Sequence, residues 1–249
     1  MLPRAFVPDL DPASGHARLS ADESAHLTRV LRLRAGARVL VFDGQGTQYL
    51  AELTATGKDA ATAALLEPAP AAAEPRIALT LVQAVLKGDK MDAVVRDATM
   101  MGVTAVWPIV TDRTVVPRAA VEQGGALDRW HRVAVASAKQ CGRAVVPEIA
   151  APSRFTALLT PDDARASALR LQLVEPSASA GDDTPSSSLP GAPPPRALVA
   201  IGPEGGWSAD EVRAALDAGW HHWTLGGRTL RAESAPLAAL AVLTYAWKL

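Results

Sequence analysis

From residue 76 onward, short apolar runs alternate with amphipathic stretches, and this alternation limits the possible folds more than any other feature of the sequence. The strand-like runs occupy residues 76–85, 103–110, 170–174 and 197–201. Between them, residues 89–101 and 126–139 show the spacing of amphipathic helices. Strands that alternate with helices predict a mostly parallel sheet covered by helices on both faces, so we expect an α/β fold.

The first 67 residues show a different, β-rich pattern. Residues 38–42 and 47–55 are strand-like, and Asp43–Gly46 between them is a turn sequence, which predicts a hairpin in a small barrel. Ser20 and Glu23 fit a capping box that opens a helix extending to about residue 31. If the helix extends that far, Arg29 and Arg32 lie on one face of it.

Two proline-rich segments interrupt these patterns. Residues 67–75 read as a linker, so we predict a first domain over residues 1–70 and a second over residues 76–249. Residues 177–195 consist almost entirely of small residues and proline, which cannot bury enough apolar surface to offset the entropy of ordering. We predict a disordered surface insertion there, within the second domain.

Composition indicates the cellular compartment of the protein and the kind of partner that it binds. The sequence contains one cysteine, Cys141, and no uncharged apolar segment of 18 residues, so we expect a cytoplasmic protein without a membrane span. The net charge of −1 does not by itself indicate nucleic acid. However, residues 29–38 carry four arginines and no acid, which is either a solvated face or a local basic stripe for RNA.

The segment GPEGG, Gly202–Gly206, follows an apolar strand and precedes a helix. Ser208 and Glu211 predict a second capping box, and Gly219 predicts the end of that helix. Ligands bind at the carboxyl ends of strands in open α/β sheets, where free main-chain amides face the crevice. The alternative is an ordinary strand-to-helix turn, although three glycines around a proline and a carboxylate exceed what a turn requires.

A second glycine-bearing strand end follows at residues 223–227. It leads to Arg228 and Arg231, and then to an apolar helix that begins near Pro236. The two arginines are either surface charges or recognise phosphate or carboxylate, which the planar guanidinium binds through two parallel hydrogen bonds.

Several common motifs are absent from the sequence. It lacks the phosphate-binding GxxxxGK[ST] loop, a GxGxxG turn between a strand and a helix, HExxH and GxSxG. We therefore expect no metal. We interpret Cys141 as a small buried thiol and His221-His222 as the start of a strand.

The segments above, taken together and in order, resemble the bacterial small-subunit ribosomal RNA methyltransferases that modify N3 of one uridine, the RsmE family of the SPOUT superfamily. The matching segments are HLTRVLRLRAG, VFDGQG, LKGDKMD, AKQCGRAVVPEI, IGPEGGWSADEV and LGGRTLRAESAPLAAL. They span nearly the whole chain outside residues 177–195. GPEGG followed by LGxRxLRxE at this spacing is the most specific part of the resemblance.

The resemblance implies a SPOUT-type methyltransferase domain with a C-terminal trefoil knot, preceded by a small PUA-like β-barrel domain that binds RNA. It further implies S-adenosylmethionine as cofactor, 16S rRNA or the 30S subunit as partner, and a homodimer. The implied cofactor-binding residues are Leu173, Val174, Glu175, Ile201, Gly202, Pro203, Gly205, Gly206, Leu225, Gly226, Gly227 and Leu230. The chain departs from the family pattern at Gly227, where proline is common, and at Ser234, where threonine is usual.

For the reaction, methylation at N3 of uracil requires loss of the N3 proton. We expect Arg231, or Arg228 in its place, to stabilise the developing anion. Glu204 and Glu233 are candidate general bases or orienting groups for arginine, and each also has a structural alternative, bridging loop amides or pinning an arginine. The candidate contacts to RNA phosphates are Arg4, Arg29, Arg32, Arg34 and Lys87.

Three alternatives stay open at this point. The first is a catalytically silent ribosome-assembly protein that binds RNA, and the second is a SPOUT methyltransferase acting on tRNA. The third is a nucleotide-dependent metabolic enzyme, which the missing phosphate motifs disfavour.

Overall fold

The chain divides into two compact units. The computed structural model describes residues 2–57, 60–123, 125–159, 168–176 and 188–249. The first unit comprises Met1–Glu74 and Val135–Val146, and the second comprises Pro75–Ala134 and Pro147–Leu249. The boundary between Glu74 and Pro75 lies within the segment predicted to be a linker.

The first unit is built on a five-stranded sheet in the order β1-β3-β4-β5-β2. Its strands are β1 (Arg4–Phe6), β2 (His16–Arg18), β3 (Arg38–Phe42), β4 (Gln48–Thr56) and β5 (Ala61–Pro68). The predicted hairpin is confirmed, because β3 and β4 pair antiparallel around a turn in which Asp43 Oδ1 accepts from the N–H groups of Gln45 and Thr47 at 2.7 and 3.0 Å. Alternate side chains of these strands, such as Val39 and Val41, form the core of the unit.

The helix predicted to begin after Ser20 ends at Val30, close to the predicted end, but only its first half is α-helical. Helix α1 (Ala21–Ala25) continues as a single π-helical turn, His26–Val30, and the backbone then reverses at Arg32, which has a φ of +56°. A left-handed residue cannot continue a right-handed helix. Arg32 therefore lies outside the helix, and the condition under which Arg29 and Arg32 would share a helical face is not met.

The capping box at the start of α1 is half formed. The hydroxyl of Ser20 accepts from the N–H of Glu23 at 3.2 Å, as predicted. However, the carboxylate of Glu23 accepts hydrogen bonds from Nζ of Lys139, at 2.8 Å to Oε1 and 2.7 Å to Oε2. Glu23 therefore joins α1 to residues 135–146 within the first unit.

Arg4 lies in the interior of the first unit, where it is 6% exposed. Its guanidinium donates to the carbonyl oxygens of Ala138 and Arg143 at 2.6 and 2.8 Å and to Oε1 of Gln48 at 2.5 Å. The ring of Phe42 lies 4.6 Å from its guanidinium carbon. The prediction that Arg4 contacts RNA phosphates is therefore wrong, because its donors are used inside the protein.

The second unit contains a seven-stranded sheet in which every pair of strands is parallel, as the alternation of strands and helices predicts. The order is β12-β10-β11-β6-β7-β8. Strand β9 also pairs with β7, further along β7 than β8 does. The strands are β6 (Ala78–Ala84), β7 (Ala105–Val110), β8 (Glu148–Ile149), β9 (Ser153–Arg154), β10 (Leu169–Leu173), β11 (Arg196–Ile201) and β12 (His221–Trp223).

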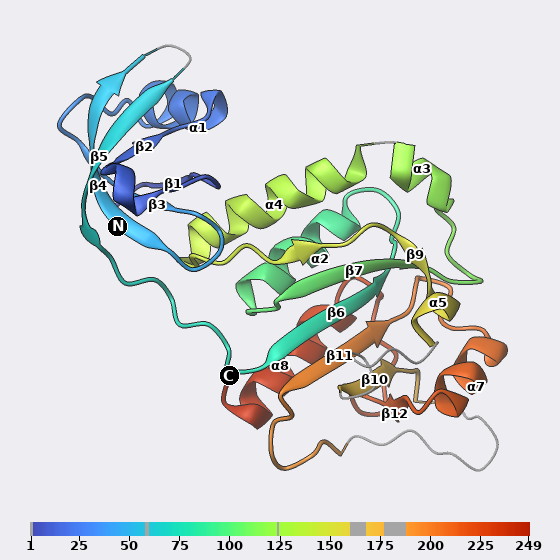
Figure 1. Cartoon of the computed structure of the whole chain (residues 1–249). Helices are drawn as coiled ribbons and strands as arrows, with labels where there is room; N and C mark the ends of the chain where they lie inside the picture. The colour runs from blue at the N-terminus through green and yellow to red at the C-terminus, as the bar shows by residue number, and fades with distance from the viewer. Residues whose placement is uncertain (1, 58–59, 124, 160–167, 177–187) are drawn as a thin grey trace. The chain divides into compact units, whose positions relative to one another are not determined.

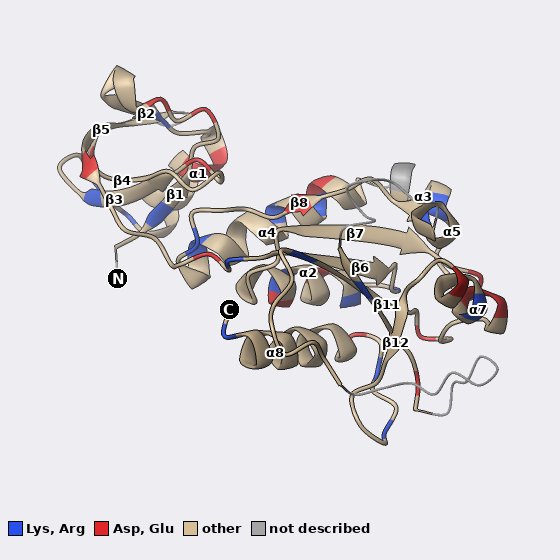
Figure 2. Cartoon of the chain, turned by 60° about the horizontal axis from the view of Figure 1, so that its bottom comes forward, with Lys and Arg blue, Asp and Glu red and all other residues tan. Residues whose placement is uncertain are grey.

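Helices flank this sheet, whose central strands are buried on both faces. The helices are α2 (Lys90–Met100), α3 (Arg118–Gln123), α4 (Ala126–Cys141), α5 (Phe155–Leu159), α7 (Ala209–Asp217) and α8 (Ala235–Trp247). Helices α2 and α8 lie side by side, and α5 lies beside α7 (Figures 1 and 2). Phe155 packs between Trp207 and Trp220, at ring distances of 4.6 and 5.8 Å, and fixes α5 against α7.

The segment predicted to be a disordered insertion is described only at its end. Residues 177–187 lie outside the described residues, so that part of the prediction is not tested. Within residues 188–195, the carbonyl of Pro190 accepts from Nε1 of Trp247 at 3.1 Å, and the carbonyl of Pro195 accepts from the N–H of Ala78 at 3.0 Å. Residues 188–195 thus make defined contacts with α8 and β6.

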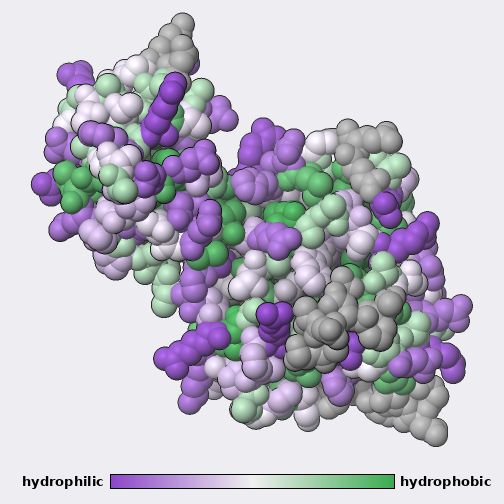
Figure 3. Space-filling view, viewed as in Figure 1, coloured by the Kyte–Doolittle hydropathy of each residue, from purple (hydrophilic) through white to green (hydrophobic). Residues whose placement is uncertain are grey.

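Among the described residues, no helix combines the length and the apolarity required to cross a bilayer. Hydrophilic side chains are spread over the face of each unit that Figure 3 shows, and hydrophobic side chains appear there in small groups.

Candidate active site

Three neighbouring parallel strands end at the same edge of the sheet in the second unit. Leu173 at the end of β10 is level with Ile201 at the end of β11 and with Trp223 at the end of β12. The loops that follow these strands therefore meet, as expected for a ligand site in an open α/β sheet. We call residues 174–176, 202–207 and 224–234 the first, second and third loops.

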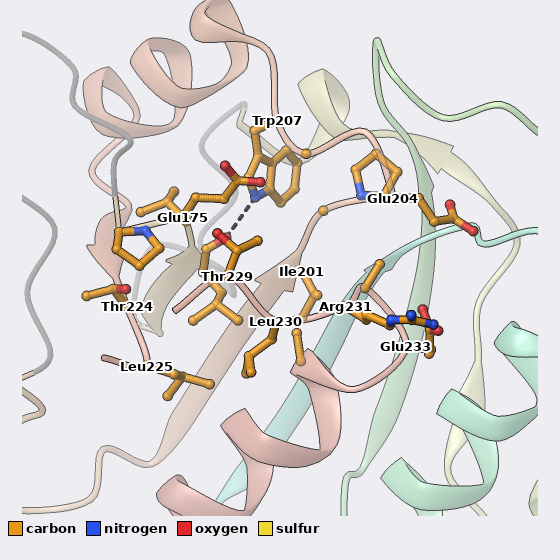
Figure 4. A pocket seen from close by; sticks show the side chains of 18 of the residues that line it. Glu175, Ile201, Glu204, Trp207, Thr224, Leu225, Thr229, Leu230, Arg231 and Glu233 are labelled. Carbon is orange, nitrogen blue, oxygen red and sulfur yellow. Dashed lines mark hydrogen bonds between the residues drawn. The ribbon is translucent and has the colours of Figure 1, made fainter. Parts of the chain in front are cut away.

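The three loops enclose a cavity of about 420 Å³ (Figure 4). Most of the predicted cofactor and catalytic residues line it, and so the structure brings together what the sequence places far apart. The predicted residues in its wall are Leu173, Val174, Glu175, Ile201, Gly202, Pro203, Glu204, Gly206, Leu225, Arg228, Leu230, Arg231 and Glu233. A cavity of this size and mixed polarity suits a small organic ligand.

Three of the predicted glycines are not among the lining residues. The carbonyl of Gly205 accepts from Arg113 Nη1 at 3.0 Å. The carbonyl of Gly226 accepts from the hydroxyl of Thr224 at 3.3 Å, and among the described residues, apart from the two chain neighbours of Gly227, no atom lies within 4 Å of the place its Cβ would occupy. Gly226 has a φ of +88°, so this glycine serves the backbone turn.

At Gly202 the requirement for glycine comes from the protein itself. A Cβ there would lie 3.1 to 3.3 Å from three atoms of the Trp207 ring. That ring is 9% exposed and its Nε1 donates to the carbonyl of Leu173 at 2.8 Å, the contact drawn in Figure 4. Trp207 thus ties the second loop to the end of β10 and lines the cavity.

A second set of contacts fixes the second loop and the start of α7. The predicted capping box between Ser208 and Glu211 is confirmed, and Oε1 of Glu211 also accepts from the N–H of Asp112 at 2.9 Å. The hydroxyl of Ser208 donates to Oδ2 of Asp112 at 2.7 Å. These bonds hold the loop after β7 against the second loop, which leaves the GPEGG segment anchored at both ends.

Glu204 and Glu233 meet at one ammonium group. Lys90 Nζ, at the start of α2, lies 3.3 Å from Glu204 Oε1 and 3.4 Å from Glu233 Oε2. Glu204 Oε1 also accepts from the N–H of Lys87 at 3.3 Å. The two carboxylates therefore pair with a lysine and not with an arginine, and the bond from the N–H of Lys87 agrees with the structural alternative in which Glu204 binds loop amides.

These contacts change the acidity of both carboxyl groups. Burial raises the pKa of Glu204, but hydrogen bonds from the main-chain N–H groups of Glu204 and Lys87 and from Lys90 outweigh it, so the pKa is lowered. The pKa of Glu233 is lowered by its own N–H group, against the opposing effect of burial, and further by Lys90 and Arg231. The hydrogen bond to Glu204 is the main cause that raises the pKa of Lys90. Both carboxylates are therefore ionised and less basic than an ordinary glutamate.

The two candidate catalytic arginines lie in the third loop. Arg228 and Arg231 are exposed and line the cavity. Within the described part of the chain, neither guanidinium lies within 4.0 Å of a carboxylate oxygen, although the charge of Arg231 acts on Glu233. Both can therefore offer several N–H donors to a ligand in the cavity.

Seven lining residues lie outside the sets named above for the cofactor or for catalysis, although Pro176 and Thr229 fall within residues 173–176 and 225–231, which the family resemblance implies as cofactor loops. The seven are Lys90, Pro176, Trp207, Thr224, Thr229, Ala232 and Ala235. Lys90 could have been found, because LKGDKMD follows the carboxyl end of β6, which is the strand beside β11. Trp207 gives no such signal, since a tryptophan after a glycine loop is more often part of the core.

The remaining candidate RNA contacts lie on surfaces. Arg29, Arg32 and Arg34 are exposed in the first unit, and Lys87 is exposed in the second. Val30 and Leu31, between the arginines, are 66% and 42% exposed. Exposed cations separated by apolar side chains suit contact with a nucleic acid.

Among the described residues, no group of three or more His, Cys, Asp or Glu side chains is arranged to hold a metal ion. The single cysteine, Cys141, is half-buried at the end of α4, where the sequence predicts a buried thiol.

Models of protein families match both parts of the chain. One described as an RNA methyltransferase domain matches residues 73–244, and one described as an RNA methyltransferase PUA domain matches residues 19–66. These ranges correspond to most of the second unit and to the centre of the first.

Individual relatives agree with these matches. The chain is 33% identical over 226 residues to the ribosomal RNA small subunit methyltransferase E of Synechocystis sp., covering 90% of this chain and 71% of the relative. The Bacillus subtilis protein of the same name is 27% identical over 236 residues, covering 91% and 89% of the two chains.

Solved structures add the fold and a ligand. The ribosomal RNA small subunit methyltransferase E of Neisseria gonorrhoeae, bound to S-adenosyl methionine, matches with a TM-score of 0.86 and 29% identity, covering 99% of this chain and 98% of the other. A Legionella pneumophila methyltransferase in complex with the same cofactor matches with a TM-score of 0.88 and 26% identity, with the same coverage. The α/β fold and the resemblance inferred from the sequence are thereby confirmed, and the chain belongs to the ribosomal RNA small subunit methyltransferase E family.

Proposed function

We propose that this protein binds S-adenosylmethionine in the three-loop cavity and transfers its methyl group to small-subunit 16S ribosomal RNA. The observation that carries the proposal is the cavity itself, formed by loops from three adjacent strand ends in a chain whose fold matches a methyltransferase solved with this cofactor.

The residues in the cavity fit such a cofactor. Leu173, Ile201 and Trp207 present apolar surface on which a planar base can pack. The carboxylate of Glu175 lies beside Trp207 in the cavity wall, where it can accept hydrogen bonds from hydroxyl or ammonium groups (Figure 4). When bound, the cofactor would supply a methyl group on a positively charged sulfur, and Glu204 and Glu233, which share the single charge of Lys90, leave the cavity wall with a net negative charge that favours binding of such a cation.

For the RNA base, we propose N3 of a uridine as the acceptor. We assign removal of the N3 proton to a water molecule, which leaves a negative charge on the uracil ring, and Arg231 is the cation we assign to stabilise that charge. Because hydrogen bonds lower the pKa values of Glu204 and Glu233, both are weak bases, and we favour an electrostatic role for them over proton removal. Arg228 takes the place of Arg231 if the third loop shifts on RNA binding.

An Arg231→Ala variant tests this assignment. We expect kcat to fall about 100-fold or more, because removal of one preorganised donor to a developing anion typically has this effect. The cofactor dissociation constant, measured by calorimetry, should change less than about threefold. Arg213→Ala, on the exposed face of α7, is the matched control and should retain full turnover. Full turnover of the Arg231 variant would remove Arg231 from the mechanism, and a loss confined to Arg228→Ala would transfer the role to Arg228.

The function as a whole is tested by mapping N3-methyluridine in ribosomal RNA from cells with and without this protein. We expect the modification to disappear at one position and to return with the wild-type gene. Unchanged rRNA together with lost tRNA methylation would indicate a tRNA enzyme. Unchanged methylation in both RNAs would indicate a catalytically silent assembly factor.

We also propose that the protein acts as a cytoplasmic homodimer with a knotted C-terminal segment, as the family resemblance implies. Helix α8 supports a dimer, because Leu237, Val242 and Tyr245 are 42%, 41% and 88% exposed on an otherwise apolar helix. Light scattering should give twice the monomer mass for the wild type and the monomer mass for Val242→Glu. A monomeric wild type would contradict the dimer.

A further inference from the structure

Lys90 connects three segments of the chain that are distant in the sequence. Its ammonium group contacts Glu204 in the second loop and Glu233 in the third loop at 3.3 and 3.4 Å, and it lies itself at the start of α2. The loop before α2 contributes as well, since the N–H of Lys87 donates to the same oxygen of Glu204. One cation thus holds the two loops that form most of the cavity wall.

The position of Lys90 in its helix is unfavourable for a cation. Lys90 is the first residue of α2, where the free N–H groups create a partial positive charge that favours acidic side chains. The adjacent N-cap residue, Asp89, makes no side-chain capping bond. The electrostatics of the helix therefore do not explain a lysine at position 90, whereas its ion pairs with Glu204 and Glu233 do.

The charges around Lys90 also determine what Arg231 can do. Without Lys90, Glu204 and Glu233 would be two carboxylates without their ammonium partner, and Arg231 is the other cation whose charge acts on Glu233. An arginine beside an unpaired carboxylate forms a bidentate pair readily. Such a pair would occupy the donors that we assign to the RNA base.

We infer that Lys90 is a positioning residue that clamps the second and third loops together and neutralises their carboxylates, which leaves the Arg231 guanidinium available to the substrate. This inference rests on the proposed function for its last part. The clamp itself depends only on the described contacts, so it can be tested in the protein without any ligand.

The experiment compares four variants of the full chain. Lys90→Met removes the charge and keeps the length of the side chain, and Lys90→Arg keeps the charge. The combined variant Lys90→Met with Glu204→Gln and Glu233→Gln removes all three charges. Arg96→Met removes a cation from the exposed face of the same helix and serves as the matched control.

The first measurement is hydrogen exchange of the main-chain amides in the ligand-free protein. In Lys90→Met, we expect exchange in residues 202–207 and 224–234 to accelerate about tenfold, and in Lys90→Arg and Arg96→Met to stay within about threefold of the wild type. In the combined variant, exchange should return most of the way to the wild-type rate, because the repulsion between the carboxylates is gone. Unchanged exchange in Lys90→Met would overturn the inference.

The second measurement is the affinity for S-adenosylmethionine by calorimetry, together with kcat. We expect Lys90→Met to weaken cofactor binding about tenfold and the combined variant to recover most of that loss. A Lys90→Met protein with normal exchange and normal cofactor affinity but lost turnover would mean that Lys90 contacts the substrate directly, which also overturns the inference. Failure of the wild type to bind the cofactor would instead contradict the proposed function, while the exchange result would still decide the clamp.

Discussion

At the scale of single residues, the site depends on side chains whose neighbours leave them little freedom. Trp207 is the clearest example, because it packs on Phe155, donates to the carbonyl of Leu173 and fills the space beside Gly202. Its indole therefore sets the distance between two strand ends. A substitution beside Trp207 should therefore change both the free energy of unfolding and the affinity for a ligand, because closely packed side chains do not rearrange easily.

Gly202→Ala tests this packing. The added Cβ would lie 3.1 Å from Nε1 of Trp207, closer than a relaxed contact, so we expect a loss of about 1–3 kcal/mol in the free energy of unfolding, the usual range for overpacking. Gly227→Ala is the control, because it has no neighbour within 4 Å and no positive φ. Its free energy of unfolding should stay the same or rise by about 0.5 kcal/mol through a less flexible unfolded chain. Equal urea midpoints for the two variants would contradict the packing argument.

The ion pairs of Lys90 predict a specific pH dependence. Glu204 and Glu233 have lowered pKa values in the folded protein, so their contribution to stability is present above the ordinary pKa of glutamate and is lost as the pH falls through the lowered values. Lys90 has a raised pKa, so its contribution is present below the ordinary pKa of lysine and is lost as the pH rises through the raised value.

Thermal unfolding across this pH range checks the prediction. The wild type should exceed the Glu204→Gln, Glu233→Gln double variant in melting temperature at neutral pH. The difference should shrink at acid pH, below the usual range of glutamate, and again at alkaline pH. A difference that does not vary with pH would mean that the carboxylates stabilise the protein by packing and not by charge.

At the scale of elements, the start of α7 determines the position of the second loop. Ser208 caps the helix and also donates to Asp112, and Glu211 is buried with both of its oxygens used. The GPEGG segment is therefore held between β11 and a helix that cannot shift without breaking several hydrogen bonds. Such preorganisation lowers the entropy that a ligand must remove when it binds.

Ser208→Ala should lower the free energy of unfolding by about 1 kcal/mol, as is typical for loss of an N-cap, and should weaken binding in the cavity through movement of the second loop. Ser208→Thr keeps the hydroxyl and should retain most of the stability and the affinity. Urea unfolding and cofactor titration measure the two effects. If the alanine variant loses stability but binds the cofactor normally, the cap supports the helix without positioning the loop.

At the scale of the whole molecule, two units with different surfaces share one substrate in our proposal. The first unit carries Arg29, Arg32 and Arg34 on an exposed segment, and the second carries the cavity. Phosphate contacts orient RNA without reading its sequence, so the first unit would contribute affinity while the cavity selects the base.

Replacing Arg29, Arg32 and Arg34 together with Gln tests this division of roles. Each lost phosphate contact makes the slope of log K against log salt less negative by about 0.7 to 0.9, so the loss of three contacts should make it less negative by about two to three. Cofactor affinity should not change. Filter binding of small-subunit RNA at several salt concentrations provides the measurement, with Arg213→Gln on α7 as the control. An unchanged slope would mean that these arginines serve only as a solvated surface.

Much of this protein was determined by its sequence alone. The strand at residues 38–42, the hairpin turn at Asp43, the capping box of α7 and the parallel sheet all follow from local patterns, because periodicity and capping depend on residues only a few positions apart. The glycine-bearing strand ends likewise indicated where a ligand would bind.

Only the tertiary structure decided which charges meet. The sequence shows Arg4 as one more basic residue, but the fold buries it among carbonyl groups, and it shows Lys90 without a role, although the fold places it between Glu204 and Glu233. The reason is physical. Electrostatic contacts act over a few ångströms in space, and the strand order that brings residues 90, 204 and 233 to one edge is set by the packing of the whole sheet.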